Sequence, residues 1–446
     1  MIICHASTSF FPFIDGGVAT HVFNLSKSLV MQGHEVHAIH LRQRDEPLYE
    51  RLHGIHVHRI EFTGRDLHNG FNEFKDYIFS ACHNLLSDDG KYGAGAPHAA
   101  PLYRPSGYEG FKAVNEFVGR EISQIADEHC ADIVHIHDFP FLFAHKYLAK
   151  RVAKIITWHV PFPPLMAPTL LDFLIPNLSS YDHVGFLTQP YLDEAVGAGL
   201  QSFGASVLWP MANSGIFHGS TKEQTEVAKQ MICKSSGRKV ILCVQRIDNK
   251  SGHEQIVRAM PKVLEQVPDA LLVFVGVHPP HYDILKSPHL RRLIVLINLL
   301  GIGASVRFLE NVGYLSMPQV YAAADVVCLC SKNEGFGLAI SEAMHCGKPV
   351  IGTNTVGIAA QIKHGLNGFL VGVGDHGATA ESIITLLLDD VLCRKMSQAS
   401  IGISRKFSMQ EGTQRHLETY MQLIEKKNIP LHSNIGRDQD AAAVHE

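Results

Sequence analysis

Hydrophobic positions along the chain follow two alternating patterns. Short apolar runs rich in isoleucine and valine, such as residues 1–7, indicate buried strands. Each run leads into a stretch with helical periodicity. The first such stretch contains Val22, Leu25 and Leu29 and ends at Gly33. The alternation predicts βαβ units, and therefore an α/β protein with doubly wound, mostly parallel sheets.

A second series of the same alternation begins after a turn-rich stretch around Pro210 and Asn213, which predicts a linker. A polar stretch rich in glycine and proline, at about residues 64–110, interrupts the first series and predicts an inserted mobile segment. Two doubly wound domains would face each other across an interdomain cleft at the carboxyl ends of their strands. The expected division is an N-terminal Rossmann-like domain at 1–212, a C-terminal Rossmann-like domain at 213–408, a helix at 409–430 packed back on the N-terminal domain, and a disordered tail at 431–446.

The composition is that of a globular protein large enough for two or three domains. A net charge of -4 gives no electrostatic case for nucleic acid, so we expect a small-molecule partner. The nine cysteines, several within apolar runs, indicate reduced core thiols. No apolar run reaches the roughly 18 residues of a membrane span, and the first residues lack the basic start of a signal peptide. We therefore expect a cytoplasmic protein with no integral membrane segment, and the oligomeric state stays open.

Histidine is abundant, with 28 copies, which raises the question of a metal site. His56 and His58 lie on one face of an expected strand, and His135 and His137 lie on one face of another. Two histidines on one strand do not make a site, and no third ligand with metal spacing stands near either pair in the sequence. The expectation is that no metal is bound.

Two loops at expected strand ends carry candidate anion-binding groups. Gly16 and Gly17 directly precede a helix, where glycines allow backbone N–H groups to approach an anion; a simple tight turn is the alternative. Arg246 and Lys250 follow the first strand of the second domain. Two cations at that position suit a diphosphate, although such residues are commonly solvated surface charges.

Glu334 and Glu342 stand eight positions apart in "SKNEGFGLAISEAM". Eight residues of continuous helix rise about 12 Å, beyond the separation of about 5 to 9.5 Å between glycosidase carboxylates. A hydrolytic pair is therefore disfavoured, although the glycines at 335 and 337 would break the helix. The spacing suits one extended ligand held at two points, and a nucleotide sugar has that shape.

Residues 331–371 closely resemble the E-x7-E signature of retaining GT-B glycosyltransferases of family 4. The glycine loop "FPFIDGGVATHV", the strands "ADIVHIHD" and "ITWHV", and the loop "VQRIDNKSGH" resemble other motifs of that family in the same order. The resemblance covers nearly the whole chain. It implies the GT-B fold, a nucleotide-diphosphate sugar as donor, a hydroxyl acceptor, and no required metal or cofactor.

The resemblance also implies roles for individual residues. Glu342 would hold the ribose hydroxyls, and Glu334 would lie beside the donor sugar. His159 would reach the donor sugar from the N-terminal domain, unless it is an ordinary core histidine. The leaving phosphate itself would deprotonate the acceptor hydroxyl on the same face, so that configuration is retained. The implied catalytic group is Glu334, His159, Arg246 and Lys250, and the implied substrate-binding group is Gly16, Gly17, Gly335, Phe336, Gly337, Leu338 and Glu342.

Three features depart from the family pattern. The family usually has R-x-x-x-x-K-G, whereas here Lys250 comes one position early and Ser251 stands where the lysine is expected. Either the loop absorbs the shift or the phosphate contact is altered. The sequences "NSGI" at the linker and "GIAAQI" after the signature also differ from the common pattern, which leaves donor recognition open.

The resulting expectation is a retaining hexosyltransferase. Its donor would be a UDP-sugar, with GDP- and ADP-sugars as alternatives, and its acceptor a soluble sugar, sugar phosphate or natural-product alcohol. The apolar stretch at 161–183 would suit a lipid-linked or cell-envelope glycan, but it lacks the basic cluster of a membrane-binding surface. A nucleotide-sugar epimerase and a catalytically inactive nucleotide-sugar-binding protein are the other hypotheses.

Overall fold

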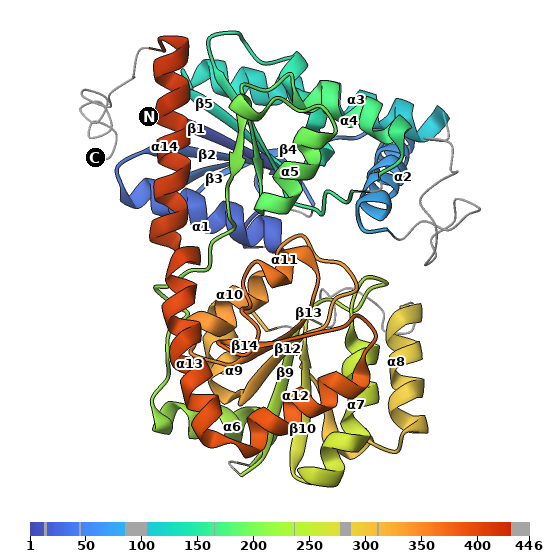
Figure 1. Cartoon of the computed structure of the whole chain (residues 1–446). Helices are drawn as coiled ribbons and strands as arrows, with labels where there is room; N and C mark the ends of the chain where they lie inside the picture. The colour runs from blue at the N-terminus through green and yellow to red at the C-terminus, as the bar shows by residue number, and fades with distance from the viewer. Residues whose placement is uncertain are drawn as a thin grey trace.

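Two parallel sheets, one in each half of the chain, form the framework of the protein (Figure 1). Their strand orders are β3-β4-β2-β1-β5-β6-β7-β8 and β11-β10-β9-β12-β13-β14. The α/β class with two doubly wound sheets is thus confirmed. The computed structural model describes residues 1–12, 16–43, 46–84, 105–164, 166–235, 237–276, 287–309 and 312–429.

The N-terminal sheet is parallel except for β3, which pairs antiparallel with β4. Apolar side chains bury both of its faces, with α1 and α14 on one side and α2 and α3 on the other. Its strands are β1 (Ile2–Ser7), β2 (Glu35–Leu41), β3 (Tyr49–Leu52), β4 (Ile55–Ile60), β5 (Ile133–His137), β6 (Ala153–Trp158), β7 (His183–Phe186) and β8 (Ala205–Val207). Its helices are α1 (Gly17–Met31), α2 (Arg65–Cys82), α3 (Pro105–Glu128), α4 (Pro168–Leu178) and α5 (Gln189–Gly197), with 3-10 turns η1 (Phe139–Lys146) and η2 (Ser202–Gly204).

The C-terminal sheet is parallel throughout its described strands, and β10, β12 and β13 are fully buried. Its strands are β9 (Lys239–Val244), β10 (Ala270–Val275), β11 (Val306–Leu309), β12 (Val326–Leu329), β13 (Val350–Thr353) and β14 (Gly368–Val371). Its helices are α6 (Lys222–Cys233), α7 (His253–Gln266), α8 (Pro288–Leu299), α9 (Met317–Ala323), α10 (Leu338–His345), α11 (Val356–Ala359), α12 (His376–Leu388) and α13 (Asp390–Ser404), with 3-10 turns η4 (Gly303–Ser305), η5 (Tyr314–Ser316) and η6 (Arg405–Phe407). None of the described helices combines the length and apolar character needed to cross a membrane.

Helix α14 (Met409–Lys427) leaves the C-terminal domain and runs along the N-terminal domain (Figure 1). Its Tyr420 is fully buried there, with the hydroxyl 2.7 Å from Nδ1 of His135 on β5. The chain passes between the domains twice, near Ala212 and near Phe407. These two segments lie side by side, because the Ala212 backbone N–H donates to the Phe407 carbonyl at 2.9 Å. The expected tail at 431–446 lies outside the described residues.

The polar stretch at about 64–110 differs from its expected irregular structure, because much of it is helical. Helices α2 and α3 pack together through aromatic rings, with Phe71 and Phe74 of α2 centred 5.9 and 4.9 Å from Phe111 of α3. Most of the intervening polar residues of α2 face outward. The polar composition of the stretch therefore gave no sign of the buried apolar stripe along one side of the helix. Residues 85–104 of the stretch lie outside the described part of the chain.

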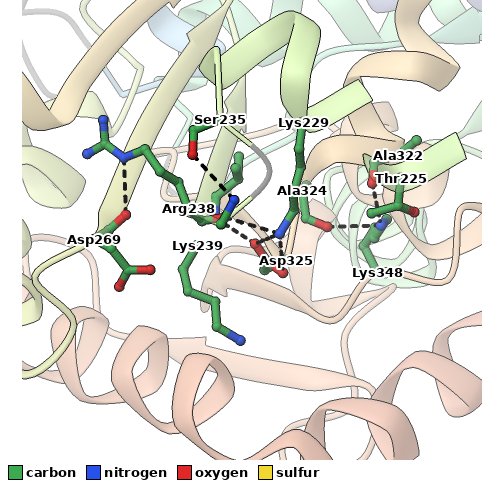
Figure 2. Close-up of polar contacts among 12 residues, drawn as sticks. Thr225, Lys229, Ser235, Arg238, Lys239, Asp269, Ala322, Ala324, Asp325 and Lys348 are labelled. Atoms are coloured by element: carbon green, nitrogen blue, oxygen red, sulfur yellow. Dashed lines mark hydrogen bonds and ion pairs between the residues drawn. The ribbon is translucent and has the colours of Figure 1, made fainter. Parts of the chain in front are cut away.

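An ion pair ties α6 to the start of the C-terminal sheet (Figure 2). Lys229 Nζ lies 2.7 and 2.9 Å from the two carboxylate oxygens of Asp325, and the Val240 N–H donates to the same carboxylate at 2.6 Å. Close by, Lys348 Nζ donates to the carbonyls of Ala322 and Ala324 at the end of α9.

We expect Asp325→Asn to lower the free energy of unfolding by on the order of 2 kcal/mol, since it leaves the largely buried Lys229 ammonium without its counter-charge. Urea unfolding measures the loss. Asp390→Asn is the matched control, because the Lys239–Asp390 pair is 3.8 Å apart and mostly exposed, and should change stability by no more than about 0.5 kcal/mol. Equal effects of the two substitutions would contradict the prediction.

Candidate functional site

The carboxyl ends of strands from the two sheets meet where the domains touch. Gly17, which begins α1 after β1, packs on Leu338, which begins α10 after β12: a β-carbon at Gly17 would lie 3.6 Å from Leu338 Cδ1. A β-carbon at Gly335 would lie only 2.4 Å from the carbonyl oxygen of His159, just after β6. Only glycine allows this approach of backbone to backbone. The structure therefore brings the two glycine loops and His159 to one place.

The two helices that begin at this place have no described side chain capping their first N–H groups. Neither α1 nor α10 carries an acidic residue in its first turn. Gly337 adopts a left-handed backbone (φ 85°) before α10, and Gln361 Nε2 donates to the carbonyls of Phe336 (2.6 Å) and Gly337 (3.2 Å). The Phe336 ring packs on Phe407, so Phe336 offers only its backbone. Uncapped helix N-termini of this kind attract anions.

Glu334 sits in a polar network built by strand-end residues. Its Oε1 lies 3.3 Å from Lys250 Nζ, and its Oε2 accepts a hydrogen bond from the Ser331 hydroxyl at 3.0 Å. The Ser331 hydroxyl in turn accepts a hydrogen bond from Gln245 Nε2 at 2.6 Å. Sequence reasoning missed Gln245. Burial works to raise the pKa of Glu334, but Lys250, His83 and the Ser331 hydroxyl together hold it below its ordinary value. Glu334 is therefore a carboxylate at neutral pH.

The early position of Lys250 is accommodated by the backbone of its loop. The Ser251 hydroxyl turns back to the carbonyl of Asp248 (2.8 Å), while Lys250 points to the Glu334 carboxylate. At Gly252 a β-carbon would lie 1.5 Å from the carbonyl oxygen of Cys330, so the loop is fixed against the end of β12. Lys250, rather than residue 251, supplies the cation beside Glu334.

A second cation and a histidine from the N-terminal domain complete this group. Arg246 is exposed, and its guanidinium makes no hydrogen bond or ion pair with the described residues. His83, at the end of α2, is buried, with Nδ1 2.8 Å from the Phe79 carbonyl. Burial, and then the charge of Lys250, lowers the pKa of His83 to about 3, with a smaller effect of Arg246. Sequence reasoning missed His83 because it falls in the polar stretch expected to be an irregular insert.

Glu342 is buried in the first turns of α10 and separate from the Glu334 network. Its Oε2 accepts a hydrogen bond from the Tyr321 hydroxyl at 2.8 Å. Burial raises the pKa of Glu342 to about 7, although the Tyr321 contact opposes the rise. Burial, and then the charge of Glu342, raises the pKa of Tyr314, whose hydroxyl lies 3.0 Å from the side-chain amide of Asn24 on α1. Glu342 thus lies close to the contact between the two domains that Tyr314 and Asn24 make.

His159 lies at the end of a chain of buried histidines. Its Nε2 is 3.2 Å from Nδ1 of His137, whose Nε2 is 2.8 Å from Nδ1 of His5. Burial lowers the pKa of His159 to about 3, so its imidazole is neutral. The backbone N–H of His159 donates to Oδ1 of Asp138 at 3.1 Å. Asp138 has a left-handed backbone (φ 72°), and burial raises the pKa of its carboxyl group to about 7. Asp138 was also missed by the sequence reasoning, which treated it only as the end of a strand.

The domain arrangement and the paired strand-end loops define a GT-B protein. Solved structures agree: sucrose-phosphate synthase from Thermosynechococcus elongatus has a TM-score of 0.73 and 20% identity, covering 95% of this chain and 99% of that one. HepE from Anabaena, in complex with UDP-glucose, has a TM-score of 0.70 and 18% identity, covering 95% and 100%.

Family models match both halves of the sequence: Glycosyltransferase Family 4 over residues 15–193 and Glycosyl transferases group 1 over residues 225–402. The chain belongs to the family 4 glycosyltransferases. Among curated relatives, a D-inositol 3-phosphate glycosyltransferase of Corynebacterium urealyticum is 30% identical over 218 residues, which is 49% of this chain. The match spans about half, 51%, of that relative's length.

Proposed function

We propose that this protein is a retaining glycosyltransferase that moves a hexosyl group from a nucleotide-diphosphate sugar to a hydroxyl of a sugar or sugar phosphate. The observation that carries the proposal is the meeting of Lys250 with Glu334 beside the uncapped N-terminus of α10, against the glycine loop of the other domain. Cations, free N–H groups and a carboxylate gathered across a domain contact suit a ligand that is anionic at one end and rich in hydroxyls at the other.

The diphosphate would lie between Arg246, Lys250 and the first N–H groups of α1 and α10. Charge that develops on a leaving nucleoside diphosphate is stabilised by such fixed donors, which need no rearrangement during the reaction. A metal ion is not needed for this neutralisation, because two side-chain cations and two helix N-termini supply it. Arg246, with no described partner, keeps its donors available for phosphate oxygens.

Glu342 would bind the ribose of the nucleotide. Only its Oε2 has a hydrogen bond among the described residues, from Tyr321, so Oε1 is left to accept from a vicinal diol. The rings of Tyr314 and Tyr321, each packed on Phe217 at 5.7 Å, shape the wall around it. A UDP-sugar is the first candidate donor, because a structure with the same fold was solved with UDP-glucose.

The donor sugar would lie between Glu334 and His159. The neutral imidazole of His159 can exchange hydrogen bonds with a sugar hydroxyl, and the Glu334 carboxylate can accept from others. Glu334 already contacts Lys250 and Ser331, which favours a role in holding the sugar over attack on its anomeric carbon. The leaving phosphate would then take the acceptor proton on the same face, and configuration would be retained.

The acceptor would approach from the N-terminal domain, where His83 and the end of α2 face the Glu334 group. Sugar phosphates are the first class to test, since the names of two similar proteins, a D-inositol 3-phosphate glycosyltransferase and a sucrose-phosphate synthase, point to phosphorylated products or acceptors.

A panel of UDP-glucose, UDP-N-acetylglucosamine, GDP-mannose and ADP-glucose, offered with and without sugar phosphates, tests the proposal. We expect one donor to raise the melting temperature and to release nucleoside diphosphate faster when an acceptor is present. Glu342→Gln should weaken donor binding by about 10-fold or more, whereas the exposed Glu223→Gln should match wild type.

The outcomes separate the competing functions. Conversion of the donor without any acceptor would point to an epimerase instead, while stabilisation with no turnover under any condition would indicate a binding protein. NMR of the product fixes the anomeric configuration, and an inverted product would refute the retaining mechanism.

A further inference from the structure

Four histidines and a glutamate gather at the amino-terminal edge of the N-terminal sheet. His37 lies on β2, His56 and His58 lie on β4, and His129 lies in the turn between α3 and β5. The parallel register places His37 directly opposite His56. Glu35 starts β2 on the same edge. The edge is opposite the strand carboxyl ends that form the candidate site.

Three of these histidines bring ring nitrogens close to one another. Nδ1 of His37 lies 2.9 Å from Nε2 of His58. One nitrogen from each of His37, His58 and His129 lies within 4.8 Å of the others. A tetrahedral zinc ion, with Zn–N bonds of about 2.0 to 2.1 Å, holds its ligand nitrogens about 3.3 Å apart. Small side-chain adjustments would therefore bring the three nitrogens to bonding distance.

Glu35 gives the group the outer partner that metal-binding histidines commonly have. Its Oε1 lies 3.0 Å from Nε2 of His37, whose ring is fully buried. That contact places the proton of His37 on Nε2 and leaves the Nδ1 lone pair directed at His58.

His56 closes one side of the group. Its ring stacks on that of His37, with centroids 4.7 Å apart, and its Nδ1 lies 2.7 Å from the Tyr49 hydroxyl. The ring of His129 also lies against that of His37, with centroids 4.1 Å apart. His58 and His129 are only half-buried, which leaves a path for an ion to enter.

Two other histidine groups are poorer candidates for metal binding. Both ring nitrogens of His135, in the group with His5 and His137, already have partners, Tyr420 and Thr157, each at 2.7 Å. The group of His21, His137 and His159 includes a residue of the candidate site, and within the described part of the chain none of its rings is hydrogen-bonded to a carboxylate.

We propose that His37, His58 and His129 bind a divalent transition-metal ion of the zinc class, with Glu35 orienting His37 and water completing the coordination. The ion would join β2, β4 and the α3–β5 turn, and its role would be structural, independent of the glycosyl transfer proposed above. Sequence reasoning did not consider this group, because only His58 belongs to the β4 pair, while His37 and His129 are both distant from it in the sequence.

Cobalt titration of tag-free, chelator-treated protein tests the site. We expect one equivalent of Co²⁺ to bind, with the visible absorption of a low-coordinate cobalt site, and Zn²⁺ to displace it. A hundredfold excess of Zn²⁺ over its dissociation constant should raise the melting temperature by about 5 °C.

Variants locate the ion. His58→Gln and His129→Gln should each abolish the cobalt spectrum, and Glu35→Gln should weaken binding about 10- to 100-fold with the fold intact. His376→Gln, an exposed histidine of the other domain, should bind like wild type. Circular dichroism verifies folding of each variant. Binding that survives His129→Gln, binding unchanged by Glu35→Gln, or no stoichiometric binding by wild type would each overturn the proposal.

Discussion

Lys250→Ala is expected to lower kcat by about 10²- to 10³-fold, the loss typical for removal of one fixed charge-stabilising donor. In the structure Lys250 is largely buried and lies 3.3 Å from the Glu334 carboxylate. The substitution would remove the positive charge that stabilises the leaving diphosphate. It would also remove a cation that helps to keep the pKa of Glu334 low. Steady-state kinetics with the donor identified in the panel measures the loss.

Matched variants distinguish charge from structure. Lys250→Arg keeps the charge and should recover part of kcat, while Lys332→Ala removes an exposed lysine from the neighbouring loop and should leave kcat within about threefold. The double substitution Lys250→Ser with Ser251→Lys restores the usual family order and should remain impaired, because the Ser251 side chain turns back to Asp248. Activity of Lys250→Ala near that of wild type would reduce Lys250 to a partner that only holds Glu334 in place.

Much of the fold could be predicted from the sequence because strands and helices of a doubly wound sheet have distinct periodicities. The runs at Ile2–Ser7 and Val326–Leu329 are mostly apolar and buried throughout, as strands covered on both faces must be. Helix α2 was missed for the opposite reason, since its buried stripe lies within a polar average composition. The alternation of apolar and polar positions indicates which residues of an element are buried. It therefore gives a weak prediction for an element in which few residues are buried.

The candidate site was partly predictable for a related reason. Motif spacing identified Glu334, Glu342 and Lys250, which lie on or next to one domain's strand ends. It did not predict His83 or His129. His83, at the end of α2, reaches the Glu334 group only through tertiary packing, and His129, after α3, reaches the other histidines in the same way. The glycines were recognised as permissive, yet the reason for Gly335, its contact with the His159 backbone, depends on how the two domains meet.

Acid should unfold this protein at an unusually high pH, because so many of its histidines are buried and neutral. A buried histidine whose folded-state pKa lies below the ordinary 6.5 favours folding above pH 6.5, and that contribution is lost as the pH falls, since the unfolded chain takes up the proton first. Histidines whose pKa is lowered to about 3 or 4, in each case chiefly by burial, include these six outside the histidine group on β2 and β4: His5, His83, His159, His183, His253 and His416.

The magnitude is large. Each such group costs about 1.4 kcal/mol per pH unit below 6.5, so six together cost about 8 kcal/mol per unit, comparable with the whole stability of a typical protein. Glu342 and Asp138 act in the opposite direction, because their pKa values are raised to about 7 and their stabilising protonated forms are retained as the pH falls. Two carboxyl groups offset only part of the effect of six histidines. We therefore expect unfolding at about pH 5 to 6.

Urea unfolding followed by circular dichroism at intervals from pH 8 to pH 5 measures this dependence. The midpoint should fall steeply below pH 6.5 in wild type. His253→Leu, in which an apolar side chain replaces a buried ring packed 4.9 Å from Phe274, should reduce the slope by about one proton, whereas the exposed His376→Gln should leave it unchanged. A urea midpoint that stays constant between pH 7 and pH 5 would mean that the buried histidines keep their ordinary pKa values in the folded protein. Water would then reach these side chains more readily than their packing indicates.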